Sequence, residues 1–422
     1  MCAQAIDYRP RIADSELAAL LSAGGAVLIE GPRACGKTAT ARRAANSEVN
    51  LETDAGARAA GRISPALLLE GERPRLIDEW QIVPDVWGHV RGAVDDSGGL
   101  PGSFILAGSS VPPDDATRHS GAGRILRLRM RPMSLAEAGY SSGGVSLARS
   151  FDGEVVGAPE SRLSVRDLAD IVSVGGWPGL QNWPVSDALA SLRGYIDDTA
   201  EVDLRRADGV KREPQRVKRL MQSLARCTAS QVSARALAAD VGGSGDRMDP
   251  HTVLDYLAAL ARVFVVEDLP AWAPSLRSKS RLREAPKRHF VDPSLAVAAL
   301  GIRPERLVRE VDTLGLLFES LVVRDFRIFA QAMDAEVFHY HDNTGLEADA
   351  VVQCRDGRWG AFEVKLGPSD IDDGANSLLR MADRVDIRRH GAPAILAVIT
   401  GWGYTYQRPD GVAVIAIGAL AA

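Results

Sequence analysis

The first third of the chain alternates short apolar runs with stretches of helical periodicity. The runs "AVLIE" (26–30), "RLIDE" (75–79) and "SFILAGSS" (103–110) each end in polar residues. Short continuous apolar runs of this kind are typical of strands that are buried on both faces of a sheet. Strands that alternate with helices predict an α/β fold, with a parallel sheet flanked by helices.

The pattern changes twice further along the chain. Residues 141–161 are mostly small and polar, which predicts a linker or an exposed loop. Residues 164–268 show helical periodicity, and from about residue 310 a helix, several strands, a second helix (369–386) and two more strands follow. The chain of 422 residues is too long for one core, which favours two to four domains.

Residues 31–38, "GPRACGKT", fit the pattern G-x-x-x-x-G-K-[ST] and stand between a predicted strand and a predicted helix. The two glycines let the backbone wrap around phosphates, so that successive N–H groups and the helix N-terminus meet the negative charge. Lys37 is expected to reach the β- and γ-phosphates, and Thr38 the Mg²⁺. The residues assigned to nucleotide binding in this loop are Gly31, Arg33, Ala34, Cys35, Gly36, Lys37 and Thr38.

Two further predicted strands end in polar residues that can serve the same nucleotide. Asp78 and Glu79 end an apolar strand, where ligands bind in such sheets. Asp78 is expected to hold Mg²⁺ through water, and Glu79 to orient or deprotonate the attacking water. The alternative is a pair of acids that only meets solvent. Ser109 ends the next strand, where its hydroxyl would sense the γ-phosphate or the chain would simply turn.

A second candidate site lies in residues 345–367, which read as two strands joined by a tight turn at 355–358. Because side chains alternate along a strand, Glu363 and Lys365 face away from Phe362. Charged residues gathered on a sheet that is otherwise built for burial need a chemical reason.

Four charged positions in this part of the chain resemble the PD-(D/E)xK nuclease pattern: Glu319 on a predicted helix, then Asp349, Glu363 and Lys365. Carboxylates on adjacent strands hold one or two Mg²⁺ ions, which polarise a phosphodiester and activate water. Lys365 would steady the attacking hydroxide or the charge that develops on the phosphoryl group. The alternatives are an ordinary ion pair on a strand surface, and a nuclease-like fold that only binds nucleic acid or serves as a scaffold.

Composition narrows the class of protein. Apolar residues make up 46% of the chain and charged residues 25%, as in ordinary soluble globular proteins. The net charge of −5 gives no chain-wide attraction for nucleic acid, so DNA or RNA would need a local basic patch. The four cysteines are scattered, which is typical of reduced thiols in a cytoplasmic protein. No stretch reads as a signal peptide or as a membrane span, so no membrane contact is expected.

Lysine is scarce in this chain. Among 50 Lys and Arg residues, the lysines are Lys37, Lys211, Lys218, Lys279, Lys287 and Lys365. Two of these six fall in the candidate sites. A chain that uses arginine wherever a cation suffices is expected to keep lysine where a compact ammonium on a flexible stem is needed.

Five stretches together resemble a widespread bacterial and archaeal family of AAA-type ATPases: "LIEGPRACGKT", "LIDEWQIVPDVW", "FILAGSS", "GAGRILRLRMRPMSLAE" and "GGWPGL". The likeness covers nearly the whole chain in the same order. It implies ATP binding and hydrolysis, a helical lid around residues 165–210, and a C-terminal domain of unknown function with a restriction-endonuclease-like pattern. Arg124 follows the third strand where ring-forming ATPases place an arginine that acts on a neighbouring subunit. A plain surface arginine is the alternative.

Three helices and a strand expected over residues 213–295 suggest a winged helix-turn-helix. DNA-binding versions place a recognition helix in the major groove. The exposed face of that helix here carries His251, Thr252 and Asp255 instead of a row of basic residues. The basic stretch 277–288 is the better candidate for phosphate contacts, and a module that serves only packing or oligomerisation is the alternative.

Together these patterns predict a P-loop AAA-type core (1–140), a linker with a helical lid (141–212), a winged-helix-like module (213–295) and a PD-(D/E)xK nuclease-like domain (296–422). The predicted function is that of a cytoplasmic AAA-type ATPase that forms a homo-oligomer. It would bind ATP with Mg²⁺ and couple hydrolysis to conformational change. DNA or RNA is a possible partner on which this change would act. The alternatives are a metal-dependent nuclease regulated by nucleotide, and a nucleotide switch that assembles protein partners.

Overall fold

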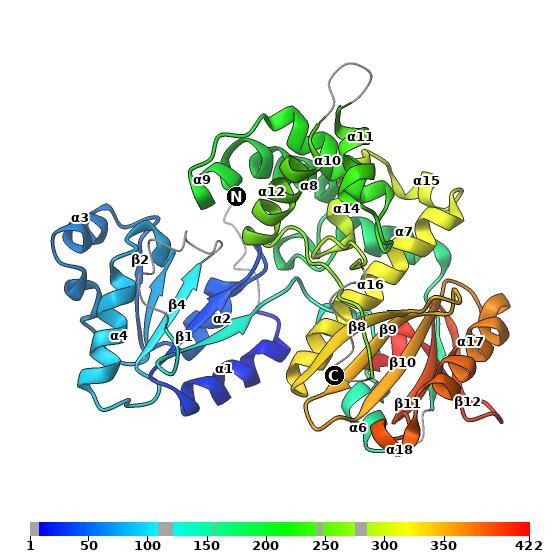
Figure 1. Ribbon diagram of the computed structural model, residues 1–422. Coiled ribbons are helices and arrows are strands. Elements are labelled where there is room, and N and C mark those ends of the chain that lie inside the picture. The colour runs from blue at the N-terminus through cyan, green and yellow to red at the C-terminus, as the bar shows by residue number, and fades with distance from the viewer. Residues whose placement is uncertain (1–7, 109–120, 155–156, 243–247, 275–284) are drawn as a thin grey trace.

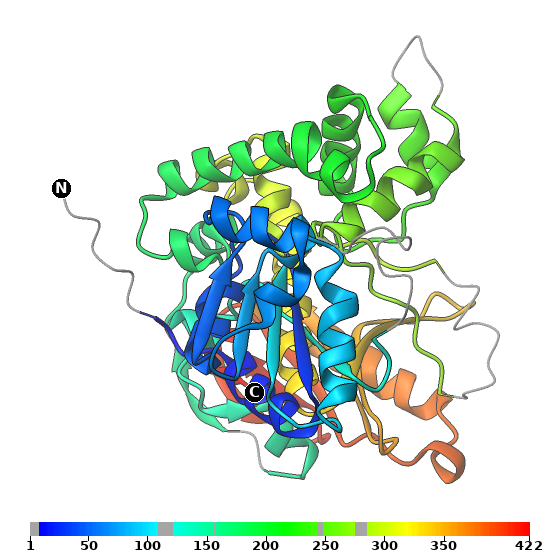
Figure 2. The ribbon, with the colours of Figure 1, turned by 90° about the vertical axis from the view of Figure 1, so that its left-hand side faces the viewer.

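The computed structural model describes residues 8–108, 121–154, 157–242, 248–274 and 285–422. Three parts can be followed in Figure 1: an N-terminal domain (8–138, blue to cyan), a helical region (165–307, mainly green) and a C-terminal domain (311–422, yellow to red). Figure 2 shows the N-terminal domain in front of the C-terminal domain, with the helical region above both. In the described residues no helix is long and apolar enough to cross a membrane.

The N-terminal domain is built on a five-stranded sheet of order β2-β3-β4-β1-β5. All four strand pairs are parallel, which confirms the parallel sheet expected from the alternation of strands and helices. Because the strands are parallel, the carboxyl ends of β1 and β3 lie at the same edge of the sheet. The strands are β1 (Ala26–Glu30), β2 (Ser47–Asn50), β3 (Arg75–Asp78), β4 (Phe104–Gly108) and β5 (Ile125–Arg129).

Helices cover both faces of this sheet, which explains the continuous apolar runs of its strands. Val27 and Ile29 of β1 pack in the core beneath α1, whereas Ala26 and Leu28 pack in the core beneath α4. The helices and turns of the domain are α1 (Ile12–Ala23), α2 (Lys37–Ala44), α3 (Ala55–Ile63), η1 (Pro65–Leu69), η2 (Trp80–Ile82), α4 (Val86–Asp96) and α5 (Leu135–Ala138).

The helical region consists of short helices and two extended segments. The segments, residues 264–272 and 285–291, run antiparallel, with Val266 opposite Phe290 and Leu269 opposite Lys287. They follow three helices, in the order that the sequence predicts; the assignment as a winged helix stays a prediction. The helices are α7 (Val165–Val174), η4 (Pro178–Leu180), α8 (Val185–Asp198), η5 (Thr199–Asp203), α9 (Leu204–Asp208), α10 (Pro214–Arg226), α11 (Ala234–Gly242), α12 (Pro250–Arg262), α14 (Pro293–Leu300) and α15 (Pro304–Leu307).

The C-terminal domain holds a seven-stranded sheet of order β7-β12-β13-β11-β10-β9-β8. The strands β8, β9 and β10 are antiparallel, whereas β10, β11 and β13 are parallel. This confirms the predicted helix, strands and second helix; the two strands predicted after them are β11 and β13, and the prediction missed β12 between them. The elements are α16 (Val311–Ala332), β8 (Ala335–His341), β9 (Glu347–Cys354), β10 (Trp359–Lys365), η6 (Pro368–Asp370), α17 (Ile371–Arg384), α18 (Ile387–His390), β11 (Ile395–Thr400), β12 (Gly403–Gln407), β13 (Ala413–Ala416), η7 (Ile417–Ala419) and β14 (Leu420–Ala421).

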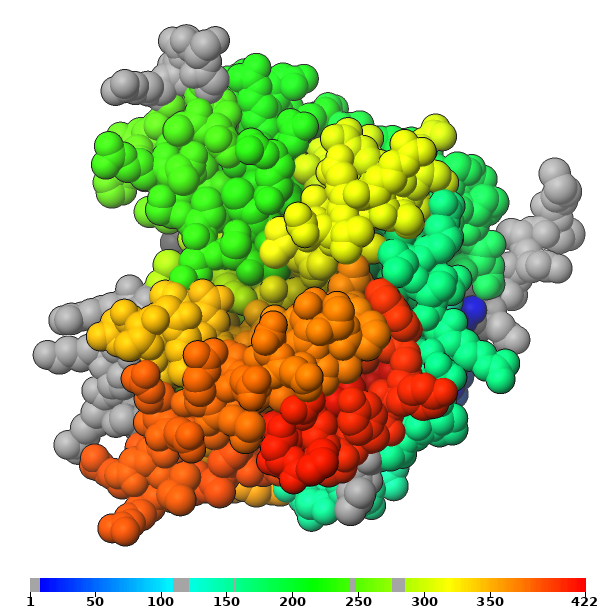
Figure 3. Space-filling view, turned by 90° about the vertical axis from the view of Figure 1, so that its right-hand side faces the viewer, coloured from blue at the N-terminus to red at the C-terminus, as the bar shows by residue number. Residues whose placement is uncertain are grey.

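The stretch 141–161 is part of this domain, and its prediction as a linker or exposed loop is wrong for several of its residues. Strand β6 (Val145–Ser146) pairs with β14, α6 (Leu147–Phe151) follows it, and β7 (Ala158–Ser161) joins the sheet edge beside β12. Figure 3 shows this stretch (teal) beside the C-terminal strands (red). An edge strand is held by main-chain hydrogen bonds and is half exposed, so it needs no apolar pattern.

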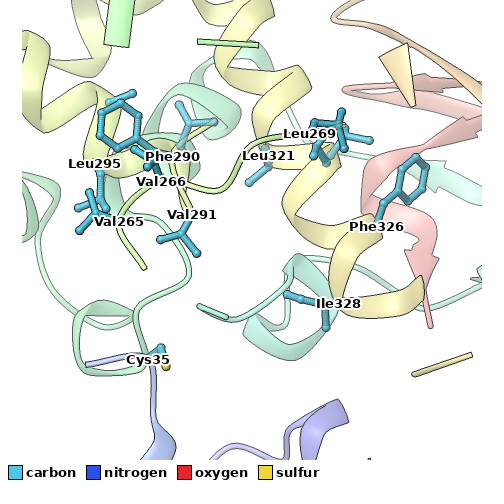
Figure 4. Packing of buried hydrophobic residues seen from close by; sticks show 14 of the residues in the cluster. Cys35, Val265, Val266, Leu269, Phe290, Val291, Leu295, Leu321, Phe326 and Ile328 are labelled. Carbon is cyan, nitrogen blue, oxygen red and sulfur yellow. The ribbon is translucent and has the colours of Figure 1, made fainter. Parts of the chain in front are cut away.

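Helix α16 joins the three parts of the molecule. It contacts α1, α7, α14 and the strands β8 to β10, and 15 of its 22 residues are buried. Figure 4 shows Leu321 of this helix next to Leu269 of the first extended segment, and Val266 of that segment next to Phe290 of the second. Because its apolar side chains are needed on several sides, the helix shows no single polar face.

Candidate functional site

The loop between β1 and α2 follows a path that requires its glycines. Gly36 has a φ of 106°, in the left-handed region that favours glycine. A Cβ atom at Gly31 would lie 2.2 Å from the carbonyl oxygen of Met130, so no other residue fits without moving the backbone. Ala34 also has a positive φ of 63°, which is unusual for a residue with a side chain and marks a constrained loop.

The ammonium group of Lys37 lies against this loop. Its Nζ donates hydrogen bonds to the carbonyl oxygens of Gly31, at 3.0 Å, and Pro32, at 2.8 Å. The side chain is buried. Both acceptors are neutral, and hydrogen bonds between a cation and an anionic oxygen are stronger than those to a carbonyl. A phosphate would therefore attract this ammonium away from the loop.

The carboxyl ends of three strands meet next to Lys37. Thr38 donates its hydroxyl hydrogen bond to the Asp78 carboxylate, at 3.1 and 3.0 Å from the two oxygens. The Asn50 side-chain amide donates to Asp78 at 2.9 Å. Burial raises the pKa of Asp78, an effect that the Thr38 hydrogen bond opposes. The structure thus brings together two predicted site residues, and it adds Asn50, which the sequence analysis missed although it also ends a strand.

Glu79 follows Asp78 in a strained conformation. Its φ of 52° and ψ of 44° are left-handed, which costs about 1 kcal/mol or more for a residue with a side chain. The amide of Gln81 donates a short hydrogen bond to the Glu79 carboxylate. Burial raises the pKa of Glu79, and the nearby Lys37 ammonium opposes that rise. A strained, oriented carboxylate beside the loop is the arrangement expected of a group that acts on a bound water.

The loop also contacts the helical region. The guanidinium of Arg33 pairs with Asp198 of α8, at 3.3 Å, and with Asp203 of η5, at 3.9 Å. Both pairs involve an exposed arginine and are weak by themselves. Residues that belong to the predicted lid are therefore already in contact with the loop.

A cleft of about 1150 Å³ opens beside the loop and α2. Its walls come from the N-terminal segment, from α2 and from η4 and the turn after it. Tyr8 lies in one wall, where its hydroxyl contacts Thr40 at 2.9 Å and its ring stacks on Arg43 at 4.7 Å. Trp183, half exposed, lies in the facing wall. The lining also includes four arginines: Arg9, Arg11, Arg42 and Arg43. A cleft with aromatic and basic side chains next to a phosphate-binding loop suits a nucleotide.

The acidic cluster of the C-terminal domain consists of Glu319, Asp349 and Glu363, with Lys365 and a second lysine, Lys287. The Lys287 ammonium donates to Glu319 at 2.7 Å and to Asp349 at 3.1 Å. Lys365 pairs with Glu363 at 3.2 Å. The four predicted residues are therefore brought together. Lys287 comes from the helical region, and the sequence analysis missed it as a member of this cluster.

A main-chain hydrogen bond of the sheet fixes the position of the Asp349 carboxylate. The strands β9 and β10 pair as far as Ala350 and Phe362. At the next position, the Val364 N–H donates to the Asp349 carboxylate at 2.9 Å, so a side-chain oxygen takes the place of a main-chain acceptor. Phe362 packs on Phe326 of α16 with ring centroids 4.5 Å apart, which fixes the orientation of β10.

The charged groups of the cluster shift the pKa values of one another. Burial and the neighbouring Asp349 carboxylate raise the pKa of both Glu319 and Glu363 to about 8. Burial would raise the pKa of Asp349 too, but the Lys287 ammonium, the Val364 N–H and the Lys365 ammonium together outweigh burial and lower that pKa. Carboxylates that crowd together in a buried place disfavour the charged form of one another.

A small hollow of about 270 Å³ lies next to the cluster and is also lined by His339 and His341. His339 is buried, its Nε2 contacts the carbonyl of Ala285 at 3.2 Å, and burial lowers its pKa to about 4, so it stays neutral. Among the described residues, no three His, Cys, Asp or Glu side chains are grouped so as to hold a metal ion. The carboxylates are suitable ligands for Mg²⁺, but two of them hold an ammonium instead.

Three family models match successive segments of the chain, in the order of its N-terminal domain, helical region and C-terminal domain. Residues 23–139 match the family described as AAA domain. Residues 165–306 match a domain of unknown function (DUF8612), and residues 314–420 match another (DUF4143).

Residues 23–139 are similar to an AAA domain, and the P-loop lies within them. Two uncharacterized proteins, from Mycobacterium bovis and Mycobacterium tuberculosis, are each 26% identical over 360 residues, which is 84% of this chain and 73% of theirs. Among solved structures, a Walker-type ATPase of Pyrococcus abyssi is similar over 70% of this chain and 99% of that chain, with 16% identity and a TM-score of 0.44. A Drosophila ORC structure bound to DNA matches with 15% identity and a TM-score of 0.20.

One further predicted residue, Arg124, lies away from the loop of residues 31–38. Ser109 falls outside the described residues. Arg124 directly precedes β5, at the opposite edge of the sheet from the loop, and pairs with Asp95 of α4 at 2.8 Å. From there it cannot reach the nucleotide of its own chain. Its role toward a neighbouring subunit stays a prediction.

Arg11 is the main structural residue that the sequence analysis missed. Its guanidinium is buried and donates to the carbonyl oxygens of Cys35 and Arg131, both at 2.8 Å, and to Glu137 at 3.0 Å. It therefore fixes the loop against the segment that follows β5. The side chain of Cys35 is buried.

The predicted nucleic-acid contacts of the helical region gain little from the structure. In the basic stretch, Lys287 points into the acidic cluster, and Arg288 forms a short ion pair with Asp268; residues 277–284 lie outside the described part. His251 and Asp255 of α12 are exposed. The described part of the stretch is thus engaged in internal ion pairs, and its assignment to phosphate contacts is wrong there.

Proposed function

We propose that this protein binds ATP at the loop of residues 31–38 and hydrolyses it. The observation that carries the proposal is the convergence of Lys37, the Thr38–Asp78 pair and Glu79 at the carboxyl edge of one parallel sheet. Each group has the chemistry that phosphoryl transfer needs, which is mainly positioning and stabilisation of charge.

The residues have separate roles in this proposal. Lys37 leaves the loop carbonyls and binds the β- and γ-phosphates. Thr38 and Asp78, which share a hydrogen bond, would hold Mg²⁺, and the ion would supply positive charge to the phosphates. Glu79, held by Gln81, orients the attacking water or accepts its proton.

The base is assigned to the cleft beside α2. Tyr8 and Trp183 face this cleft from the N-terminal segment and from the helical region. Stacking on such side chains is worth roughly 1–3 kcal/mol per base. Because Trp183 belongs to the helical region, a bound nucleotide would contact both parts of the molecule and bias their arrangement.

The protein acts as an oligomer in this proposal. Arg124 is exposed and lies away from its own site, so it completes the site of a second copy. An arginine supplied in this way stabilises charge in the transition state. Hydrolysis would then change the contact between the loop and the helical region, in which Arg33 pairs with Asp198.

The test is an assay of ATP turnover by the purified full chain, with and without Mg²⁺, and with and without added DNA or RNA. The proposal expects turnover that requires Mg²⁺. Stimulation by DNA or RNA would identify nucleic acid as the partner; turnover that neither one changes would favour a protein partner. Absence of turnover under all conditions, with ATP bound, would reduce the protein to a nucleotide switch.

A second candidate function is metal-dependent cleavage of phosphodiesters by the acidic cluster. The observation that favours it is the convergence of Glu319, Asp349, Glu363 and Lys365 within one domain. Incubation of the full chain with plasmid DNA, single-stranded DNA and RNA in Mn²⁺ tests it. Cleavage that persists in Asp349→Asn would come from a contaminant and would refute this candidate.

A further inference from the structure

Arg11 is held rigidly against the loop of residues 31–38. Its Nη1 donates to the carbonyl oxygen of Cys35 and its Nη2 to the carbonyl oxygen of Arg131, both at 2.8 Å. Its Nε pairs with Glu137 at 3.0 Å, and the side chain is only 4% exposed. Three acceptors in a buried place leave the guanidinium a single position.

The bond to Cys35 sets the direction of one peptide group of the loop. The Cys35 carbonyl and the Gly36 N–H belong to the same peptide, and in a trans peptide these two groups point in opposite directions. Because the carbonyl is turned toward Arg11, the Gly36 N–H is turned away from it. Among the described residues this N–H has no hydrogen-bond acceptor. It is therefore available to an oxygen of a ligand.

The conformation of Gly36 and the place of Arg11 depend on one another. Gly36 has a φ of 106°, and a Cβ atom on it would lie 3.2 Å from Nη1 of Arg11, so only glycine leaves the guanidinium its room. A cation bonded to a carbonyl oxygen also polarises the peptide, which strengthens the N–H of that peptide as a donor. Arg11 thus affects both the direction and the strength of this donor.

We propose that Arg11 is a positioning residue of the phosphate site, which holds the Cys35–Gly36 peptide so that the Gly36 N–H donates to a phosphate oxygen of the bound nucleotide. This inference rests on the proposed ATP site and adds to it a residue that acts through the loop. Arg11 itself does not need to touch the phosphates.

The first experiment measures the affinity of the full chain for inorganic triphosphate and for ATP by calorimetry. Arg11→Met is expected to bind both ligands at least about tenfold more weakly than the wild type, because a charged donor no longer holds the peptide. The two losses should be equal, since the peptide serves the phosphates and not the base. A folded Arg11→Met that binds triphosphate as the wild type does would overturn the inference.

Glu137→Gln is the matched control for a purely structural effect. Glu137 anchors Arg11 and accepts hydrogen bonds from the N–H groups of Ile12 and Ser134, both at 2.8 Å. The substitution removes its charge and leaves the bond from Arg11 to Cys35 in place. It should lower the temperature of unfolding, yet keep triphosphate binding within about threefold of the wild type. An equal loss of affinity in both variants would overturn the inference.

The second experiment observes the peptide itself. Cys35–Gly36 is the only Cys–Gly step in the sequence, so a chain labelled with carbonyl-¹³C cysteine and ¹⁵N glycine gives a single carbonyl-to-amide signal in NMR. Saturation of the wild type with triphosphate should move the Gly36 amide proton downfield, as a new hydrogen bond to an anionic oxygen does. The shift should be smaller in Arg11→Met. A Gly36 signal that triphosphate does not move in the wild type would refute the inference.

If Arg11→Met does not fold, both measurements are made on Arg11→Lys. This variant keeps the charge but replaces the planar fork, which reaches two carbonyls, by a single ammonium. Weaker binding of triphosphate together with a smaller shift of the Gly36 signal supports the inference, and wild-type values overturn it.

The proposed function can fail separately. Binding of triphosphate by the wild type without turnover of ATP would refute hydrolysis and leave the inference intact. Turnover of ATP by the wild type, with unchanged affinity in Arg11→Met, would support the function and refute the inference. A wild type that binds neither ligand would refute both.

Discussion

Two lysines in different surroundings distinguish the AAA-type site from the acidic cluster. The Lys37 ammonium donates to two carbonyl oxygens, whereas the Lys287 ammonium donates to two carboxylates. Carbonyl acceptors hold a cation less strongly than carboxylates do. Lys37 can therefore exchange its carbonyl acceptors for an anionic ligand, whereas Lys287 is already paired with two carboxylates. A lysine next to acids is thus no sign of an open site until its partners are known.

The open space beside Lys37 is also larger than the space beside Lys287. A cleft of about 1150 Å³ lies beside the loop that holds Lys37, and a hollow of about 270 Å³ lies beside Lys287. The first can take a nucleotide and the second only a small ligand. We infer that the molecule has one open site and one closed site in this conformation.

A large loss of ATP binding is expected from a substitution in the open site. Lys37→Ala should weaken ATP binding by at least about 100-fold, because it removes a cation from the β- and γ-phosphates. Equilibrium binding of a fluorescent ATP analogue measures this. Lys211→Ala, at an exposed lysine, should bind like the wild type. Unchanged binding by Lys37→Ala would refute the claim that Lys37, unlike Lys287, is available to an anionic ligand.

A second prediction asks whether each site is formed by residues of a single chain. The acidic cluster is complete in a single copy, whereas the AAA-type site is proposed to take Arg124 from a neighbour. Arg124→Ala should keep its affinity for ATP and lose turnover by about 1000-fold. Mixing it with Lys37→Ala should restore part of the activity at shared interfaces. A strictly monomeric ATP-bound protein, with no rescue on mixing, would contradict the oligomer.

Glu267 joins the helical region to the N-terminal domain through a buried ion pair, and its contribution to stability can be tested. It pairs with Arg131 after β5, at 2.6 Å, and its own segment carries Leu269, which holds Lys287. Burial alone would raise the pKa of Glu267, but Arg131 and Arg327 outweigh it and hold the pKa well below its usual range. Glu267→Gln should therefore lower the free energy of unfolding by about 2–3 kcal/mol at pH 7, because it removes the carboxylate that neutralises the buried Arg131 and Arg327.

The pH dependence of this effect has a definite sign. The folded pKa of Glu267 lies below the ordinary value of 4.5, so its contribution to stability is complete above about pH 4.5 and is lost as the pH falls through the folded pKa. Urea unfolding at pH 7 and at pH 3.5 should show a smaller difference between wild type and Glu267→Gln at the lower pH. Glu310→Gln, in an exposed pair with Arg306, should change stability by less than about 0.5 kcal/mol at either pH. A difference that grows in acid would refute the assignment.

The smallest effect is expected in the cleft. Trp183→Ala should weaken ATP binding by roughly tenfold through the loss of stacking, and the tryptophan fluorescence change on binding should diminish with it. Tyr404→Ala, at an exposed aromatic residue of the C-terminal domain, serves as the control. If ATP and inorganic triphosphate lost affinity equally in Trp183→Ala, the base would not bind in this cleft.

The parts of the molecule that could be predicted from the sequence depend on local pattern. The strands β1, β3 and β4 follow from short apolar runs, and the loop of residues 31–38 is specified by contiguous residues. Glu319, Asp349 and Glu363 are distant in sequence, but each lies on an element with a clear period, so their convergence could be expected.

The features that were missed depend on tertiary contacts. Strand β7 is held at a sheet edge by main-chain hydrogen bonds, which leave no apolar pattern. Arg11 is a buried arginine, and a charged residue reads as exposed until its partners are known. Lys287 lay in a basic stretch that suggested phosphate contacts. The scarcity of lysine was the one signal that could have singled it out.

The most direct test of the central claim compares binding and turnover in Glu79→Gln. This substitution keeps the shape of the side chain and removes its charge, so ATP should bind within about threefold of wild type while single turnover slows by at least about 100-fold. Glu52→Gln, at an exposed residue of the same domain, should behave as wild type in both measurements. Turnover by Glu79→Gln at the wild-type rate would contradict the assignment of Glu79 and, with it, the proposed mechanism of the open site.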